Sequence, residues 1–208
     1  MSDSGACDGR HPETALDLEL VLASTSIYRR ALLGRLGIPF RWRPPVCDES
    51  TLKLGAWNPV QLAEKLAEAK AASLALEEKT AAIIGSDQVV SFQGQVFGKP
   101  GTPERAVEQL LALSGQTHEL ITSMAVIQGS RTFRHTDVTL LQMRPLSRAA
   151  VERYVSADQP LDCAGSYKIE SRGIVLFERI ESEDQTAIPG LPLIALVSIL
   201  RDLGFEIP

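Results

Sequence analysis

The run Ile83-Ile84-Gly85-Ser86-Asp87-Gln88 places small and polar residues inside an apolar stretch that extends over residues 81–92. The flanking Ile and Val residues predict a buried strand, broken at the Gly-Ser-Asp-Gln segment. An aspartate buried without a partner costs roughly several kcal/mol. We therefore expect Asp87 at a strand edge facing a cleft, near cations or a metal ion, where it activates water or binds the ion. The alternative is a turn or bulge in which the Asp87 carboxylate is hydrogen-bonded and has no catalytic role.

Strands and helices mix on both sides of this run. Expected strands cover residues 18–23, 40–43, 119–128, 132–142 and 173–179, and Gln93-Gly94 marks a turn into a further short strand. Expected helices cover residues 27–36, 60–76, 103–113, 147–155 and 191–203, with Ser26 and Ser147 as N-caps. This mixture predicts an α/β or α+β fold.

Composition limits the function classes. The chain has 208 residues and a formal net charge of −5, so nothing global attracts it to nucleic acid or to an anionic membrane. Any phosphate must be bound by local basic residues. The spacing of Cys7, Cys47 and Cys163 gives no disulfide framework and no metal pair, which favours free thiols in the cytoplasm.

The chain is expected to form one domain over residues 18–208. No apolar run approaches the roughly 20 residues that a bilayer-spanning helix needs. Residues 1–17 contain acids and lack the apolar segment of a secretory signal, so we expect a flexible extension ahead of the fold.

The run Ser24-Thr25-Ser26-Ile27-Tyr28-Arg29-Arg30 precedes and opens an expected helix. Backbone N–H groups at a helix start favour an anion, and the hydroxyls add donors. Two arginines in a first turn are poorly placed for the helix dipole, which indicates a phosphate site. The alternative is a solvated basic face. The chain has no Walker A pattern, so this is not a P-loop.

Other charged residues are weaker candidates when taken alone. The pair Asp48-Glu49 suits a hard cation such as Mg²⁺, which prefers carboxylates and phosphate oxygens, or it lies in a solvated loop. Lys70 lies within a long expected helix, where exposed lysines are routine. Lys99 stands between a Gly and a Pro, which restricts its backbone and could aim it at a phosphate.

A run of small residues, Cys163-Ala164-Gly165-Ser166, leads into Tyr167-Lys168-Ile169-Glu170. An ionised carboxylate accepts hydrogen bonds only, so Glu170 suits a purine edge with two N–H donors, as guanine has. The alternative is a surface loop. The histidines, at His11, His118 and His135, have no partner at metal-ligand spacing and are interpreted as incidental.

These pieces, in this order, resemble the Maf family of nucleoside triphosphate pyrophosphatases. The matching runs are LASTSIYRRALL, CDES, LAEAKA, IIGSDQVV, FGKP, LSGQTHE, CAGSYKIES and GLPLIAL, spread from Leu22 to Leu196. The resemblance implies a mixed α/β fold like that of inosine triphosphate pyrophosphatases, an elongated sheet with two lobes flanking a central cleft. It also implies hydrolysis between the α and β phosphates with a divalent cation, Mg²⁺, Mn²⁺ or Co²⁺.

The resemblance also assigns roles to residues. It implies that Asp87 is catalytic and that Glu49 and Asp87 associate with the metal ion. The implied phosphate-binding residues are Ser24, Arg29, Arg30, Lys70 and Lys99, and the implied specificity residues are Tyr28 and Glu170. We also expect Gln88 to read the base together with Glu170.

Within the family, Tyr28, Cys163, Glu170 and the run GLPLIAL resemble the branch that acts on 7-methyl-GTP. The dTTP/UTP branch typically has Gln where Glu170 stands, and many members have Pro where Ile27 stands. N7-methylguanine carries a positive charge, so stacking on Tyr28 gains a cation–π contribution of about 0.5–2 kcal/mol. Glu170 would pair with the N1–H and N2–H donors, whereas Gln suits the mixed edge of a pyrimidine.

The sequence therefore predicts a 7-methyl-GTP pyrophosphatase, a house-cleaning enzyme for modified nucleotides. We expect Asp87 to deprotonate a water that attacks a phosphorus in line, while cations stabilise charge on the phosphate oxygens. Two alternatives stay open, a dTTP/UTP pyrophosphatase and a non-catalytic nucleotide-binding regulator of cell division. The complete set of acid, base and cations argues against the regulator. The expected binding partner is the nucleoside triphosphate, and a second copy of the chain is a further candidate partner in a homodimer.

Overall fold

A single mixed sheet organises the chain. The computed structural model describes residues 18–207, so the expectation for residues 1–17 lies outside the described part. The strands are β1 (Leu20–Ala23), β2 (Arg41–Arg43), β3 (Ala82–Phe92), β4 (Gln95–Phe97), β5 (Thr117–Gln128), β6 (Arg131–Met143) and β7 (Phe177–Glu181). Their order is β2-β1-β3-β5-β6-β7, with β4 paired to β3. β1 is parallel to β2 and β3 and the other pairs are antiparallel, which confirms the mixed class.

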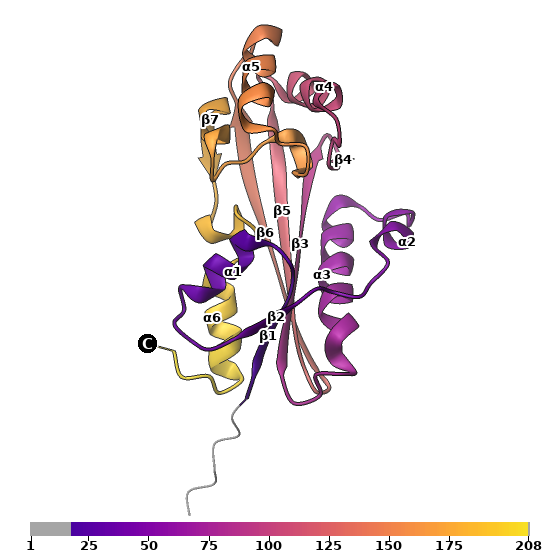
Figure 1. Ribbon diagram of the computed structural model, residues 1–208, viewed down its shortest axis with the longest axis vertical. Coiled ribbons are helices and arrows are strands. Elements are labelled where there is room, and N and C mark those ends of the chain that lie inside the picture. Colours follow the sequence, from indigo (N-terminus) through magenta and orange to yellow (C-terminus); the bar gives the residue numbers. More distant parts are fainter. Residues whose placement is uncertain (1–17, 208) are drawn as a thin grey trace, which may run out of the picture.

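The sheet is elongated because β3, β5 and β6 are long and run along the main axis of the molecule (Figure 1). The helices are α1 (Ile27–Gly34), α2 (Glu49–Lys53), α3 (Pro59–Ala75), α4 (Pro103–Leu113), α5 (Arg148–Asp158) and α6 (Leu193–Asp202). At one end of the sheet α3 lies on one side and α1 and α6 on the other, while α4, α5 and β7 form the other end (Figure 1). This arrangement gives the two lobes that the sequence predicted.

Local sequence explains the helix starts. The Ser26 side chain accepts a hydrogen bond from the Arg29 backbone N–H and caps α1, as predicted. Asn58 and Gln61 form a reciprocal capping box at the start of α3. Ser147 caps α5, also as predicted. Each cap satisfies N–H groups that the first helical turn leaves without partners.

Two predicted elements were wrong in detail. β3 is not broken at Gly85–Gln88, because these residues keep their antiparallel pairing with β5, including Asp87 with Ser123. The strand expected over 173–179 begins only at Phe177. Residues Arg172–Leu176 form a short 3₁₀ helix (η2), and the backbone N–H of Gly173 donates to the Lys168 carbonyl at 2.8 Å.

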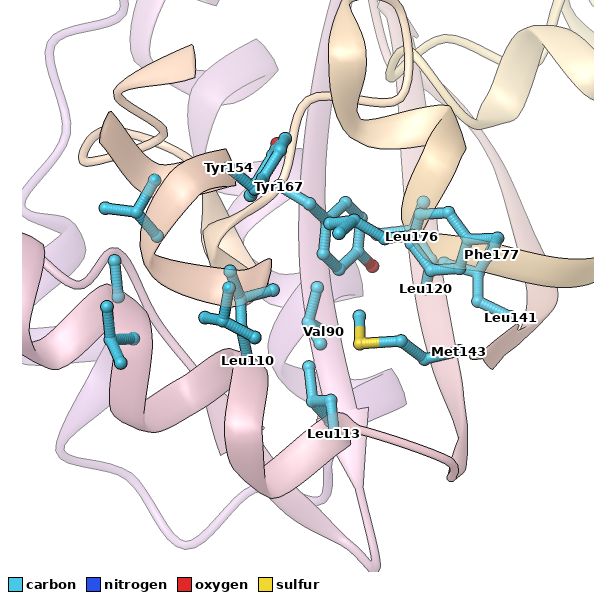
Figure 2. Close-up of a cluster of buried hydrophobic side chains, with 14 residues drawn as sticks. Val90, Leu110, Leu113, Leu120, Leu141, Met143, Tyr154, Tyr167, Leu176 and Phe177 are labelled. Atoms are coloured by element: carbon cyan, nitrogen blue, oxygen red, sulfur yellow. The ribbon is translucent and has the colours of Figure 1, made fainter. Parts of the chain in front are cut away.

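Side chains on β3 alternate between two packed faces. One face packs against α3: Ile83 joins Ala71 and Leu74, and Val89 joins Leu62 and Leu66. On the other face, Ile84 joins the cluster around α1 and α6. Further along this face, Val90 joins a cluster of side chains from α4, α5, β5 and β6 (Figure 2). Asp87 therefore projects toward α3, and Gln88 projects toward the opposite face.

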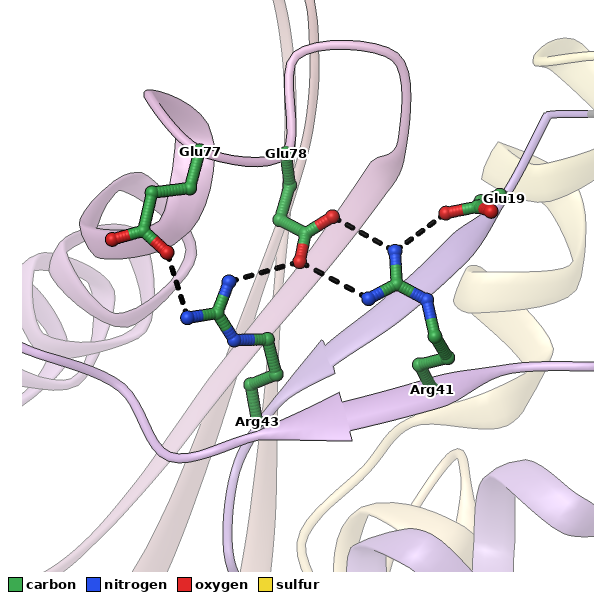
Figure 3. A network of polar contacts seen from close by, with 5 residues as sticks. All are labelled: Glu19, Arg41, Arg43, Glu77 and Glu78. Carbon is green, nitrogen blue, oxygen red and sulfur yellow. Dashed lines mark hydrogen bonds and ion pairs between the residues drawn. The ribbon is translucent and has the colours of Figure 1, made fainter.

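An ion-pair network holds the edge strand β2 (Figure 3). The guanidinium groups of Arg41 and Arg43 both contact the Glu78 carboxylate, at 2.8 and 3.0 Å. Glu19 and Glu77 flank them, on Arg41 and Arg43 respectively. Single exposed pairs contribute little, but a network shares its ordering cost and places charge on an exposed sheet edge. The network fixes the end of α3 relative to β2.

Candidate active site

A cleft of about 330 Å³ opens where α1, α2 and α3 meet the middle of β3. The middle of β3 is open there, since β1 pairs with β3 up to Ile84 and β4 pairs with it from Val90. The cleft is lined by most of the predicted site residues, namely Arg29, Glu49, Lys70, Asp87, Gln88, Lys99 and Glu170. The prediction that Asp87 faces a cleft near cations agrees with this geometry.

The centre of the cleft is a lysine between two carboxylates. Lys70 Nζ lies 2.5 Å from Asp87 Oδ1 and 3.0 Å from Glu49 Oε1. Lys70 and Asp87 are both buried, at 8% relative exposure each. Lys70 is thus not on an exposed helix face, which corrects the alternative left open from the sequence. The ion pair satisfies charges that burial would otherwise make costly.

Gly85 makes this approach of helix and strand possible. A Cβ at Gly85 would lie 2.2 Å from the Ala67 carbonyl oxygen and 2.5 Å from the Ala71 backbone nitrogen of α3. Real Cβ atoms do not make such contacts, so only glycine allows α3 to pack this closely. Gly85 and Asp87 lie on the same face of β3, and the close packing brings Lys70 within reach of Asp87.

Glu49 begins the short helix α2, which the sequence did not predict. Asp48 caps this helix, and its Oδ1 accepts hydrogen bonds from the backbone N–H groups of Ser50 and Thr51. Burial opposes ionisation of Glu49, but contacts with Lys53 and Lys70 outweigh it and lower the pKa of Glu49 to about 2. Of the Asp48-Glu49 pair, only Glu49 lines the cleft.

Arg29 lies against the wall of the cleft formed by the loop before α6. Its Nε donates to the Gly190 carbonyl oxygen at 2.9 Å. Burial lowers the pKa of Arg29, while the charges of Asp87 and Glu49 raise it. Ser26, the α1 cap, lines the cleft beside it. A helix start with an adjacent arginine is a favourable place for phosphate oxygens.

The segment 162–170 also lines the cleft. Burial raises the pKa of Tyr28, and the negative charge of Glu170 raises it further. Burial also raises the pKa of the Glu170 carboxyl. Lys168 Nζ lies 3.4 Å from Asp162 Oδ1 and anchors the segment to the end of α5 through the Asp158 and Gln159 carbonyls.

Three predicted site residues do not line the cleft: Ser24, Tyr28 and Arg30. Ser24 is buried and its Oγ accepts a hydrogen bond from the Ser26 backbone N–H. The Arg30 guanidinium lies 4.3 Å from the ring centroid of Trp42, and its buried Nε has no hydrogen-bond partner among residues 18–207. Their roles with substrate stay predictions.

Lys53 and Asp162 line the cleft but were not among the predicted site residues. The spacing of Glu49 and Lys53, one helical turn apart, could have indicated that Lys53 lies beside Glu49. That inference requires residues 49–53 to be helical, which the sequence did not predict. Gln88 was predicted as a base reader. Its amide nitrogen donates to Thr122 Oγ1 at 2.8 Å and to the Ile188 carbonyl at 2.9 Å, and its role toward the base stays a prediction.

The family model described as Maf-like protein matches residues 19–203. The chain belongs to the Maf family. It is 52% identical to the 7-methyl-GTP pyrophosphatase of Bdellovibrio bacteriovorus over 88% of this chain and 96% of that protein. The 7-methyl-GTP pyrophosphatase of Xanthomonas axonopodis pv. citri is 49% identical, over 91% of this chain and 98% of that protein. The solved structure of a HAM1 protein from Coxiella burnetii aligns with a TM-score of 0.45 at 15% identity, covering 89% of this chain and 99% of that one.

The divalent cation expected from the sequence would bind at Glu49 and Asp87. Both carboxylates reach one point, because both contact Lys70 Nζ. Within residues 18–207, no group of three or more His, Cys, Asp or Glu side chains could hold a metal ion. Mg²⁺ commonly uses one or two carboxylates together with substrate phosphates. An ion that arrives with a nucleotide and uses these two carboxylates stays a prediction.

The described helices of this Maf-family chain are too short or too polar to cross a bilayer. Cys47 and Cys163 are free thiols, and burial raises the pKa of the Cys163 thiol to about 12. A thiol with a raised pKa is a poor nucleophile, and Cys163 lines the cleft.

Proposed function

We propose that this chain hydrolyses the bond between the α and β phosphates of 7-methyl-GTP, releasing 7-methyl-GMP and pyrophosphate. One observation carries the proposal. The buried Lys70–Asp87 pair, with Arg29 and Lys99 on the same cleft, shares that cleft with the Glu170 carboxylate. Two relatives at about half identity, each covering most of this chain, carry the name 7-methyl-GTP pyrophosphatase and support it.

At the base end, Glu170 accepts hydrogen bonds from N1–H and N2–H of the guanine. The negative charge of Glu170 also complements the positive charge that N7-methylation gives the base. Tyr28, whose pKa is raised by the charge of Glu170, offers an aromatic face for the same cation. Unmethylated GTP lacks the charge, so this end of the cleft favours the methylated nucleotide.

At the phosphate end, Arg29, Lys70 and Lys99 bind and orient the triphosphate. Asp87 accepts the proton of the attacking water, and the cations stabilise the charge on the equatorial and leaving oxygens. A divalent cation, Mg²⁺, Mn²⁺ or Co²⁺, polarises phosphate oxygens when bound with the nucleotide, and Glu49 and Asp87 would hold it. Lys70 contacts both carboxylates and holds them side by side.

A substrate panel tests the function. Pyrophosphate release is measured with 7-methyl-GTP, GTP, dTTP and UTP, each with Mg²⁺, Mn²⁺ and Co²⁺. The proposal predicts the largest kcat/KM for 7-methyl-GTP. If kcat/KM is largest for dTTP or UTP, the chain is a dTTP/UTP pyrophosphatase. Binding of nucleotides without release of pyrophosphate under any condition would favour the non-catalytic regulator.

A further inference from the structure

The carbonyl oxygen of Gly190 connects the sheet to the Arg29 guanidinium. Gly190 lies in the loop between the 3₁₀ turn Gln185–Ala187 (η3) and α6. Its oxygen accepts from Arg29 Nε at 2.9 Å and lies 2.8 Å from Ser86 Oγ. Ser86 is fully buried on β3, and its hydroxyl also lies 2.9 Å from the Ser123 carbonyl of β5. The single hydroxyl proton is therefore shared between two carbonyl groups, and it ties the loop to two strands.

Position 190 strongly favours glycine. Its φ of +113° is a conformation that residues with a side chain rarely adopt. A Cβ there would also lie 3.0 Å from Arg29 Nε and 3.3 Å from Arg29 Nη2. A side chain at this position would therefore crowd the guanidinium and force it to shift. The backbone carbonyl of Gly190 binds Arg29, and the lack of a side chain at Gly190 leaves room for the guanidinium.

The loop around Gly190 is fixed by β3 and β5. The Gln88 amide nitrogen lies 3.1 Å from the Ala187 carbonyl and 2.9 Å from the Ile188 carbonyl. Thr122 Oγ1 donates to the same Ala187 carbonyl at 2.9 Å. Because these donors are largely buried, their bonds compete weakly with water and hold the loop firmly. Gln88 acts here on the loop that carries Gly190.

With Nε committed to Gly190, the plane of the Arg29 guanidinium is set. Its terminal nitrogens have no hydrogen-bond partner within residues 18–207, and they are not buried orphan donors. Because Arg29 lines the cleft, these nitrogens are open to it. A guanidinium fixed in this way offers a two-pronged contact to phosphate oxygens without paying again for its ordering.

We propose that Gly190 is a positioning residue, which aims Arg29 at the triphosphate and is itself held by Ser86. The proposal rests on the proposed function for the identity of the ligand. The positioning role itself requires only that the carbonyl of Gly190, and the lack of a side chain there, fix the phosphate-binding Arg29.

Three single variants provide the first test. Gly190→Ala lowers kcat/KM by about 10- to 100-fold, because small displacements of a positioning group have effects of that size. Ser86→Ala gives a smaller loss in the same direction. Ser91→Ala is the matched control: Ser91 is buried on the same strand, its Oγ has no hydrogen-bond partner among the described residues, and the variant keeps wild-type kcat/KM. Wild-type kcat/KM in a folded Gly190→Ala protein overturns the proposal.

A double-mutant cycle separates positioning from general damage to the fold. Arg29→Lys keeps the positive charge but has neither Nε nor a planar fork. If Gly190 acts through Arg29, then Gly190→Ala causes little further loss when Arg29→Lys is already present. Losses that multiply in the double variant would show that Gly190 acts independently of Arg29 and would contradict the proposal.

Binding of inorganic tripolyphosphate, measured by calorimetry, distinguishes failure of this proposal from failure of the proposed function. If the wild-type protein releases no pyrophosphate from any nucleotide, the proposed function is contradicted, but the positioning role of Gly190 is not. Weaker tripolyphosphate binding by Gly190→Ala and Ser86→Ala, with unchanged binding by Ser91→Ala, then still supports the positioning role. Unchanged binding in all three variants overturns it. If Gly190→Ala does not fold, Ser86→Ala decides by the same criterion.

Discussion

Gly85 of β3 and Ala67 of α3 are in such close contact that a Cβ on Gly85 would lie 2.2 Å from the Ala67 carbonyl oxygen. This contact sets the distance between the strand that carries Asp87 and the helix that carries Lys70. The chemistry of the cleft thus depends on a residue that has no functional group. The relationship also gives a direct prediction for a small substitution.

Gly85→Ala should separate α3 from β3 and weaken the Lys70–Asp87 contact. Overpacking of this kind costs about 1–3 kcal/mol, so the free energy of unfolding falls by that order and turnover falls with it. Gly34→Ala is the control, because a Cβ there meets nothing within 4 Å. Urea unfolding and a pyrophosphate assay on both variants make the comparison. An unchanged Gly85→Ala protein would show that the close contact is not needed.

Asp87→Asn should leave the fold intact and remove most turnover. The amide keeps the size of the carboxylate but cannot take a proton from water, and loss of a general base costs about 10²- to 10⁴-fold in kcat. Asp202→Asn, an exposed site at the end of α6, serves as the control. Circular dichroism checks the fold and steady-state kinetics gives kcat. Near-normal turnover of Asp87→Asn would remove the base role.

Glu170→Gln should reduce turnover of 7-methyl-GTP more than that of GTP. Both bases present N1–H and N2–H, so the hydrogen bonds cancel in the comparison, and only the attraction between the Glu170 charge and the charged methylated base is lost selectively. That attraction is on the order of 1.4 kcal/mol, so the ratio of the two kcat/KM values should fall by about tenfold. Glu178→Gln, exposed on β7, should leave the ratio unchanged. Equal losses for both nucleotides would mean that Glu170 does not read the base.

His118 should make the fold sensitive to mild acid. Burial lowers the pKa of His118 to about 4, against about 6.5 in an unfolded chain. The unfolded state therefore binds the proton first, and stability is lost as pH falls from about 6.5 toward 4. The contribution is on the order of 3 kcal/mol across that window.

Urea unfolding between pH 7 and pH 4.5 checks this dependence. His118→Phe removes the group that titrates and should flatten its part of the pH profile. Tyr167→Phe keeps the buried imidazole while removing its hydroxyl partner, which lies 3.0 Å away, so it should keep the slope. Identical pH profiles for wild type and His118→Phe would contradict the assignment.

The sequence predicted the long elements well because their signals are local. Ser26, Ser147 and the apolar spacing of residues 60–76 specify helices through caps and periodicity. It failed where tertiary pairing overrides local pattern. The polar Gly85–Gln88 segment stays in β3 because β5 supplies its hydrogen bonds. Residues 172–176 form a 3₁₀ helix and not a strand, because Gly173 packs against the Lys168 carbonyl.

The candidate site shows the same division. Asp87 was detectable because a carboxylate in an apolar strand needs a partner. The partner itself was not detectable from the residues around Lys70, since helical spacing does not say which face meets a strand. The contacts of Arg30 with Trp42 and of Gln88 with the Ile188 carbonyl join distant segments, so no local pattern indicates them.

Product identification tests the central claim most directly. Purified protein is incubated with 7-methyl-GTP and a divalent cation, and the products are followed by phosphorus NMR and mass spectrometry, with Asp87→Asn in parallel. The account predicts 7-methyl-GMP and pyrophosphate in equal amounts from the wild-type protein and almost none from the variant. Release of orthophosphate with 7-methyl-GDP, or equal product from both proteins, would contradict it.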